Sequence, residues 1–320
     1  MKRGSFVSFL SLIPFLTTAC AATPAGLARP NGVAPLPDGS VSVMDFGNYR
    51  VARVSPDGAL LASFGGLGAG PDQIFFGWDM AADEAGNIYI CNQIADDADT
   101  THDSVKVFSP DGKLIREIGA TDYEPGADRN YIPYGLDLDG EGRVYVASFG
   151  TSTVRVFDSQ GTLLGELFGG VGKGPGEFES MSDVAIDDSR GLLYVSDNLN
   201  SQIQQFALTF RAGTVTAAHV ETFGMYGRGP GQFAYPQNLA VDDRTGQLFV
   251  GDVANRRVQV FDANGDYVSE ITLPAGVADW QVMGLNVGGD GALYVADALN
   301  DAVWVFEPDG RLRRKIEVGT

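Results

Sequence analysis

The chain is a succession of short stretches in which apolar and polar positions alternate, and one such pattern recurs six times. Each copy holds a glycine, an apolar or aromatic stretch, a polar loop, a second alternating stretch and a closing turn. The clearest copies are residues 291–310, 246–265 and 191–206, and looser copies are residues 142–161, 86–112 and 39–58. Alternation with a period of two indicates strands with one buried face. Recurrence at a regular spacing indicates that each copy is one structural unit packed against its neighbours.

The spacing of the copies predicts the architecture. A polar residue ends the central strand of each copy, at Asp45, Asn92, Ser148, Asp197, Asp252 and Asp297, so the intervals are 47, 56, 49, 55 and 45 residues. Such intervals are typical of a propeller blade of four strands, which takes roughly 40–50 residues. In the fifth copy the predicted strands cover 238–242, 247–251, 257–261 and 267–271. The sequence therefore predicts an all-β fold, a six-bladed β-propeller of four-stranded antiparallel blades, over residues 31–320.

The loop between the second and third strands carries the most specific motif. In the fifth copy Asp252 is followed by Asn255, Arg257 and the alternating stretch 258–261. Partial copies of the motif begin at Asp45, Asp197 and Asp297. This pattern resembles the NHL repeat family, which implies the propeller fold but leaves the activity open, because one fold hosts many functions. We interpret the repeated Asp and Asn as ligands of the loop backbone, with a polar recognition surface as the alternative.

The first twenty residues have the features of an export signal. Lys2 and Arg3 precede an apolar run over 6–16, which is too short to span a bilayer as a mature helix. Cys20 follows Ala19 and small polar residues, and this end resembles a bacterial lipobox, which implies lipidation of Cys20 and an outer-membrane lipoprotein. Cleavage without lipidation, giving a periplasmic or extracellular protein, is the alternative. The predicted organisation is a signal peptide over 1–20, a short linker over 21–30 and the propeller over 31–320.

The charge of the chain limits its partners. The sequence has 22 basic and 41 acidic side chains, a net charge of −19. Removal of the signal leaves 20 basic side chains and a net charge of −21. Nucleic acids require a basic footprint, so the charge argues against them and predicts no nucleic-acid partner, whereas cations and basic partners are favoured. The remaining cysteine, Cys91, has no partner for a disulfide and is expected to be a small buried apolar residue.

The second copy departs from the repeat by an expanded acidic loop over 92–104. The loop carries a histidine, His102, and four carboxylates, Asp96, Asp97, Asp99 and Asp103. Ca²⁺ prefers six to eight oxygen ligands of this kind. The loop lacks the spacing, the central glycine and the closing Glu of an EF-hand. A calcium site and a solvated acidic loop are the two interpretations.

Alignment of the first strands predicts a ring of residues at one mouth of the central channel. One equivalent position holds Asn31, Trp78, Tyr134, Ser182, Gln237 and Met283, and the next holds Gly32, Asp79, Gly135, Asp183, Asn238 and Gly284. From this ring we predict a ligand site of Trp78, Asp79, Tyr134, Asp183, Gln237 and Asn238. Asp79, Asp183 and Asn238 could together bind a metal ion, for which Ca²⁺ is the candidate. Packing of the blade entrances around ordered water is the alternative.

Glycine-rich connections over 64–71, 168–178 and 223–233 could be mistaken for phosphate-binding loops. No helical pattern follows them, whereas both phosphate fingerprints need a strand, a loop and a helix. We therefore predict glycine corners with an aromatic plug between blades. Lys173 and Arg228 occupy matching positions of two connections and could project onto the face of the ring where a ligand would bind.

The sequence matches few of the residue patterns that known catalytic sites require. The amidating lyases, which resemble NHL propellers, use three histidines for zinc, whereas this chain has only His102 and His219. No nucleophile elbow or Ser-His-Asp order is present. Calcium-dependent lactonases of the six-bladed type match only in residue type. The sequence thus predicts no catalytic residue and a monomeric, exported module that binds a protein, a peptide or another small ligand. The alternative is a Ca²⁺-dependent hydrolase or lyase at the channel mouth.

Overall fold

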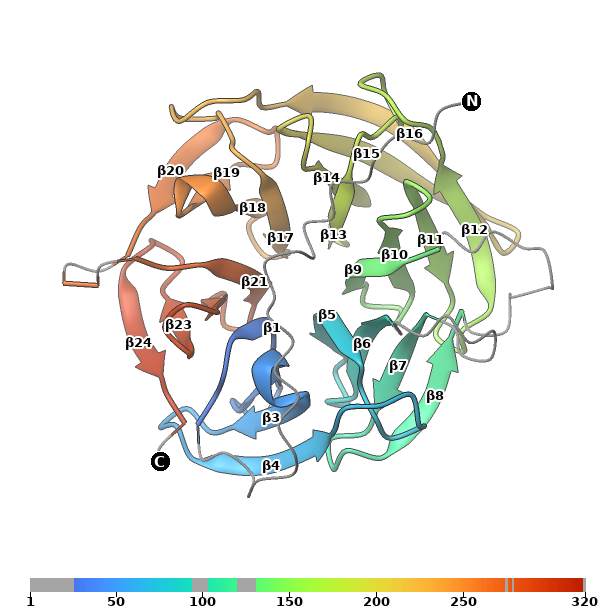
Figure 1. Ribbon diagram of the computed structural model, residues 1–320. Coiled ribbons are helices and arrows are strands. Elements are labelled where there is room, and N and C mark those ends of the chain that lie inside the picture. Colours follow the sequence, from blue (N-terminus) through green and yellow to red (C-terminus); the bar gives the residue numbers. More distant parts are fainter. Residues whose placement is uncertain (1–25, 94–102, 120–130, 274–275, 278, 319–320) are drawn as a thin grey trace, which may run out of the picture.

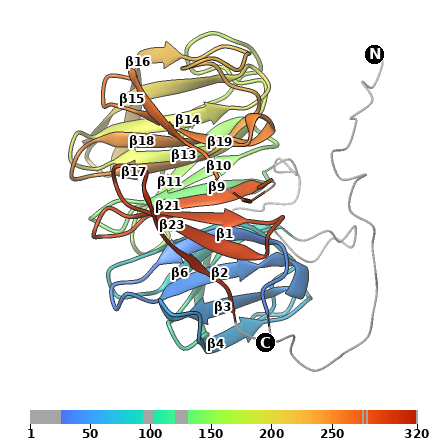
Figure 2. The ribbon, with the colours of Figure 1, turned by 90° about the vertical axis from the view of Figure 1, so that its left-hand side faces the viewer.

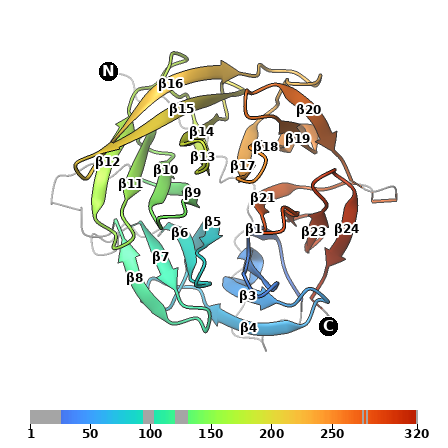
Figure 3. The same cartoon turned by 180° about the vertical axis from the view of Figure 1, so that it is seen from behind.

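Six antiparallel sheets, each of four consecutive strands, surround a central channel (Figure 1). The computed structural model describes residues 26–93, 103–119, 131–273, 276–277 and 279–318. Figures 1 and 3 show the ring from its two sides, and Figure 2 shows it turned by 90°. Besides strands, the described residues form two short 3-10 helices, η2 (Phe46–Asn48) and η3 (Val253–Asn255). The predicted six-bladed β-propeller is confirmed.

The blades follow one another along the chain, each from its innermost to its outermost strand. Blade 1 consists of β1 (Pro30–Pro35), β2 (Val41–Asp45), β3 (Arg50–Val54) and β4 (Leu60–Gly65). Blade 2 consists of β5 (Phe76–Ala82), β6 (Ile88–Gln93), β7 (Ser104–Phe108) and β8 (Leu114–Ile118). Blade 3 consists of β9 (Pro133–Leu138), β10 (Val144–Ser148), β11 (Thr153–Phe157) and β12 (Leu163–Phe168).

The second half of the ring has the same organisation. Blade 4 consists of β13 (Met181–Asp187), β14 (Leu192–Asp197), β15 (Gln202–Arg211) and β16 (Thr214–Phe223). Blade 5 consists of β17 (Pro236–Asp242), β18 (Gln247–Asp252), β19 (Arg257–Phe261) and β20 (Tyr267–Ile271). Blade 6 consists of β21 (Val282–Val287), β22 (Leu293–Asp297), β23 (Ala302–Phe306) and β24 (Leu312–Ile316). The strands predicted for blade 5 agree with these bounds to within two residues.

Burial decreases from the middle of each blade outwards. Every residue of β2, β10 and β22 is buried, because these strands are covered on both faces by the neighbouring blades. Their sequences are accordingly almost continuous apolar runs. The outermost strands β4 and β8 instead alternate between more covered and more exposed residues, since one of their faces meets solvent. The alternation of apolar and polar residues in the sequence is therefore clearest in the outer strands.

The ring closes at a boundary between blades, without exchange of a strand. β1 pairs only with β2 inside its own sheet, and it packs against β21 and β22 of blade 6. Leu27, which precedes β1, lies in one buried apolar cluster with Ile316 and Val318 from the end of blade 6. The first and last described segments thus seal the same seam by apolar packing.

The Asp-x-x-Asn motif fastens the loop between the second and third strands. The fully buried Asp252 carboxylate accepts hydrogen bonds from Asn255 Nδ2 (2.8 Å), Arg257 Nε (3.0 Å) and the Ala234 N–H (2.7 Å). Asp45 has matching bonds from Asn48, Arg50 and the Ala28 N–H. These contacts confirm the structural interpretation of the motif, because each carboxylate satisfies donors of its own loop and of the preceding connection.

The glycine-rich connections place an aromatic ring between neighbouring blades. Phe178 is fully buried among residues of blades 3 and 4, and Phe233 is fully buried between blades 4 and 5. Side chains of the third strands hold the connections: Gln204 Nε2 donates to the Glu177 carbonyl and Gln259 Nε2 donates to the Gln232 carbonyl, both at 2.7 Å. The predicted aromatic plug is confirmed in these two connections, whereas the buried Ile74 takes the equivalent position after the connection over 64–71.

The pairing of the strands gives the ring two different faces. Pro30 at the start of β1 pairs with Asp45 at the end of β2, and Arg50 at the start of β3 pairs with Gly65 at the end of β4. The start of the innermost strand, the loop after the second strand and the connection to the next blade therefore lie on one face. We call it the loop face, and we call the opposite face, which carries the hairpin turns, the turn face.

Candidate functional site

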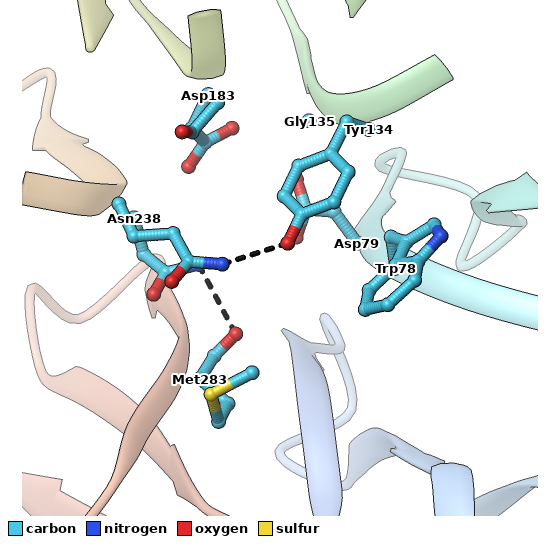
Figure 4. A pocket seen from close by; sticks show the side chains of 9 residues that line it. Trp78, Asp79, Tyr134, Gly135, Asp183, Asn238 and Met283 are labelled. Atoms are coloured by element: carbon cyan, nitrogen blue, oxygen red, sulfur yellow. Dashed lines mark hydrogen bonds between the residues drawn. The ribbon is translucent and has the colours of Figure 1, made fainter. Parts of the chain in front are cut away.

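The ring of residues predicted at the channel mouth lines a single cavity on the loop-face side of the channel. Its lining consists of Trp78, Asp79, Tyr134, Gly135, Ser182, Asp183, Gln237, Asn238 and Met283 (Figure 4). All members of the predicted ligand site are among them, contributed by the innermost strands of blades 2, 3, 4 and 5. Asn31, Gly32 and Gly284 of the same ring do not line the cavity. Its volume is only about 10 Å³, which is close to the space that one water molecule requires.

Polar side chains of the innermost strands connect each blade to the next. Asp79 Oδ2 accepts the Leu136 N–H of blade 3 (2.9 Å), and Asp183 Oδ2 accepts the Leu239 N–H of blade 5 (2.7 Å). Asn238 Nδ2 donates to the Met283 carbonyl of blade 6 (3.1 Å). These bonds point along the ring in one direction, so the residues that line the cavity also join the blades.

One further carboxyl group of this kind was missed by the sequence reasoning. Asp137, on β9, accepts the Ile186 N–H of blade 4 through Oδ2 (2.8 Å) and the Leu138 N–H through Oδ1 (2.8 Å). Burial raises its pKa to about 7. Asp137 does not line the cavity. Its position inside an otherwise apolar stretch was the available signal, because a carboxyl group in such a strand needs hydrogen-bond partners.

Asp79 and Asp183 meet at the cavity although they come from blades 2 and 4. The two carboxyl groups lie close enough to affect each other's pKa. Burial raises the pKa of Asp79 to about 7, against the opposing effect of its backbone hydrogen bonds. Burial, and then the charge of Asp79, raise the pKa of Asp183 well above its usual range. The two groups therefore form an acid pair that holds a proton near neutral pH.

A strap of two side chains crosses the channel at the mouth. Gln237 Nε2 of blade 5 donates to the Tyr134 hydroxyl of blade 3 (2.8 Å), so the bond spans blades that are not neighbours (Figure 4). The Tyr134 ring stacks on Trp78, with centroids 5.0 Å apart and planes at 22°. The aromatic group continues through Phe46 and Phe76 on one side and Phe149 on the other. The mouth of the channel is thus lined by aromatic side chains, and one hydrogen bond crosses it.

Exposed apolar side chains gather on the loop face. Among the described residues, the large apolar side chains exposed in loops are Leu67, Phe149, Val171, Leu199, Met225, Tyr226, Tyr235 and Leu299. All of them belong to the loops after second strands or to the connections between blades, which open on the loop face. The other exposed apolar side chains, Leu60, Leu61, Ile115, Leu163, Val220 and Val268, lie on outermost strands. The hairpin turns of the turn face contribute none within the described residues.

Several predicted site residues lie outside the part of the chain that the structure describes. They are Cys20 and, in the expanded loop of blade 2, Asp96, Asp97, Asp99 and His102. Asp103, at the end of that loop, is half-buried. Cys91 is a buried free thiol whose pKa is raised by burial and by the charges of Asp79 and Asp183. Over the described ranges, no helix is long and apolar enough to cross a membrane.

A metal ion would find few ligands in the cavity. Asp79, Asp183 and Asn238 offer oxygen atoms, but both carboxyl groups already accept backbone N–H groups. Ca²⁺ requires six to eight oxygens, and the volume leaves room for about one water. No group of three or more His, Cys, Asp or Glu that could hold a metal occurs among the described residues. The predicted calcium site therefore stays a prediction, with an incomplete set of ligands.

Comparisons with known proteins agree with this architecture. A family model described as "6-bladed beta-propeller" matches residues 138–219. Rat peptidylglycine alpha-amidating monooxygenase is 31% identical over 175 residues, which cover 53% of this chain and only 17% of that protein. Mouse NHL repeat-containing protein 3 is 28% identical over 173 residues, covering 49% of this chain and 45% of that protein. The chain thus spans less than half of the length of either relative.

Solved structures share the fold at low sequence identity. A gluconolactonase from Xanthomonas campestris aligns with a TM-score of 0.61 and 17% identity, over 87% of this chain and 86% of that chain. A streptogramin B lyase aligns with a TM-score of 0.58 and 14% identity, over 92% and 84%. At these identities the likeness concerns the fold alone. The chain is a six-bladed β-propeller with NHL-repeat-containing relatives.

Proposed function

We propose that this chain is an exported binding and scaffolding module of the cell envelope, which recognises a protein, a peptide or another small ligand on its loop face. The supporting observation is the distribution of exposed apolar side chains, which among described loops all open on that face. Exposed apolar side chains concentrated on one face favour an interaction site there. Aromatic side chains such as Trp78, Tyr134 and Phe149 at its centre are the residue types that supply most binding energy at interfaces.

Partner capture from an envelope extract tests the loop face. The double substitution Trp78→Ala and Tyr134→Ala at the mouth, and separately Leu199→Asp with Leu299→Asp in the loops, should abolish capture of the partner. Ile115→Asp with Leu163→Asp is the matched control, because these equally exposed side chains lie on outermost strands. Near-ultraviolet circular dichroism establishes that the variants are folded. Unchanged capture by both loop-face variants would remove this face from the proposal.

Attachment to the envelope through Cys20 is part of the same proposal. Its support is the charged, apolar and small-residue order of the first twenty residues. Metabolic labelling with a fatty acid should label the full chain, and Cys20→Ser should abolish the label and release the protein in soluble form. A labelled Cys20→Ser variant, or an unlabelled wild type, would leave free secretion as the alternative.

The second candidate function is a metal-dependent hydrolase or lyase at the channel mouth. One observation favours it: oxygen atoms of Asp79, Asp183 and Asn238 converge on one cavity from three blades (Figure 4). Among the similar proteins are a lyase and a gluconolactonase by name, but at their identities the similarity supports only the fold. The small cavity and the short ligand set make binding the better-supported proposal.

A further inference from the structure

We propose that the channel cavity binds a primary ammonium group, presented on a lysine side chain by the partner that occupies the loop face. This inference rests on the proposed binding function and specifies the chemistry of the partner. It follows from three properties of the cavity: one buried acceptor that lacks a donor, the size of the space and the apolar side chains at its entrance.

An unsatisfied acceptor points to a missing donor. Asn238 is 7% exposed, and its Oδ1 has no hydrogen-bond partner. The orientation of the amide is fixed, because Nδ2 donates to the Met283 carbonyl (3.1 Å) and Oδ1 must therefore face the other way. A buried acceptor without a partner costs about 1–3 kcal/mol. A ligand that donates a hydrogen bond to Asn238 Oδ1 would remove this cost.

The other polar groups beside Asn238 are also suited to accept. Asp79 and Asp183 line the same cavity, and their carboxyl oxygens already accept backbone N–H groups of blades 3, 4 and 5. Carboxylate oxygens and an amide oxygen from three blades make a set of acceptors that carries negative charge once the pair loses a proton. An ammonium group has three N–H donors and one positive charge, which match this set.

The size of the cavity distinguishes between cationic side chains. A space of about 10 Å³ is close to what a water molecule occupies, and an ammonium head is similarly small. A guanidinium group is larger, planar and carries five donors in a fixed fork. The cavity therefore favours the end of a lysine over the end of an arginine.

The entrance is suited to a hydrocarbon stem. Trp78 and Met283 line the cavity, and the Tyr134 ring stacks on Trp78 at the mouth. Lysine side chains pack their methylene groups along apolar surfaces while the ammonium group reaches polar atoms. The strap between Gln237 and Tyr134 crosses this path, so one of the two side chains has to rotate for a stem to enter.

The charge of the whole chain favours the same ligand. With a net charge of −19, the protein attracts basic groups and repels acidic ones over distances of about a Debye length.

The probe for the test is n-butylammonium, which has the four-carbon stem and the head group of lysine. Its binding to the full chain is measured by nuclear magnetic resonance titration at pH 8, beside n-butanol and n-butylguanidinium of equal stem length. We expect saturable binding of n-butylammonium, and at least about tenfold weaker binding of both other compounds. Equal binding of n-butanol would overturn the proposal, because it would show that only the stem is recognised.

Variants locate the site. Asp183→Asn and Asp79→Asn keep the size of the side chain and should each weaken n-butylammonium binding by about tenfold or more. Asp137→Asn is the matched control, since Asp137 is half-buried on an innermost strand, as Asp79 is, but does not line the cavity. Thermal melting identifies any variant that fails to fold, and the two substitutions in the pair provide independent evidence. Binding unchanged in both folded variants would overturn the assignment.

The outcomes also separate this inference from the proposed function. If the loop-face variants abolish partner capture while lysine acetylation of the captured partner has no effect, the module binds as proposed and the ammonium site is wrong. If Ca²⁺ displaces n-butylammonium in a one-to-one manner and binds more tightly, the cavity is a metal site and the inference is overturned. Loss of capture on acetylation, with capture restored by unmodified partner, supports it.

Discussion

Gly135 of blade 3 lies directly against the backbone of Asp183 in blade 4. A Cβ atom at position 135 would be 2.6 Å from the Asp183 Cα and 2.7 Å from the Ser182 carbonyl oxygen. Real Cβ atoms do not approach backbone atoms this closely, so the absence of a side chain is what lets the two innermost strands meet. Asp183 and Asp79 of blade 2 thereby line one cavity, where the charge of Asp79 raises the pKa of Asp183.

We therefore expect Gly135→Ala to separate blades 3 and 4 at the channel. Overpacking of this kind should lower the free energy of unfolding by about 1–3 kcal/mol, as measured by urea denaturation. Gly289→Ala is the control, because a Cβ atom there meets nothing within 4 Å. Equal stability of the two variants would contradict the close approach of the strands.

The acid pair predicts that stability falls as pH rises from mildly acidic to neutral values. Burial raises the pKa of Asp79 to about 7 and that of Asp183 well above its usual range, whereas an unfolded Asp titrates near about 3.9. The stabilisation from holding these protons is fully present below about pH 4 and is lost as pH rises through about 7. We expect the free energy of unfolding to decrease by roughly 2–4 kcal/mol over this window, measured by urea denaturation at a series of pH values.

Asp79→Asn should make the free energy of unfolding depend less steeply on pH, because it removes one titrating group from the pair. Asp137 acts with the same sign, since burial raises its pKa to about 7. Tyr134 and Cys91 also face the pair, but the pKa of each is raised by burial above its usual alkaline value, outside the window. At Asp242 the effect of burial is outweighed by hydrogen bonds from Arg244, so its lowered pKa favours unfolding only in stronger acid. A slope that is the same in wild type and Asp79→Asn would be evidence against the pair.

The sequence was sufficient for the fold because the repeat aligns one blade with the next. The same alignment identified the residues of the cavity, since equivalent positions of successive blades must surround the channel. Trp78, Tyr134 and Gln237 were placed at the mouth in this way. Whether that cavity binds a ligand is a property that the alignment does not address.

The repeat in the sequence does not predict interactions between blades that are not neighbours. The bond from Gln237 to Tyr134 crosses from blade 5 to blade 3, and Asp79 of blade 2 shares one cavity with Asp183 of blade 4. Both depend on how closely the innermost strands approach, which is set by the size of single residues such as glycine. Asp137 was missed for a different reason, because its partner is a backbone N–H of the next blade rather than a recognisable motif.

The buried ion pair of the Asp-x-x-Asn loop should contribute strongly to stability. The side chains of Asp252 and Arg257 are 0% and 8% exposed and lie 3.0 Å apart. Asp252→Ala leaves buried donors without their acceptor and should lower the free energy of unfolding by roughly 3–5 kcal/mol. Lys113→Ala, which breaks the exposed pair with Asp111, should change it by less than about 1 kcal/mol. Similar effects in chemical denaturation would indicate that the motif serves recognition instead of architecture.

Addition and removal of calcium decide between the two candidate functions at the channel mouth. The protein oxygens of Asp79, Asp183 and Asn238 provide about half of the ligands that Ca²⁺ requires, and the carboxyl pair holds a proton that a metal would have to displace. We therefore expect the melting temperature to be the same in excess EDTA and in millimolar Ca²⁺. A ligand that binds only the folded protein raises the melting temperature by mass action, so a clear rise with Ca²⁺ that disappears in Asp183→Asn would support the metal-dependent hydrolase or lyase. A rise that persists in Asp183→Asn would instead locate the calcium away from the channel.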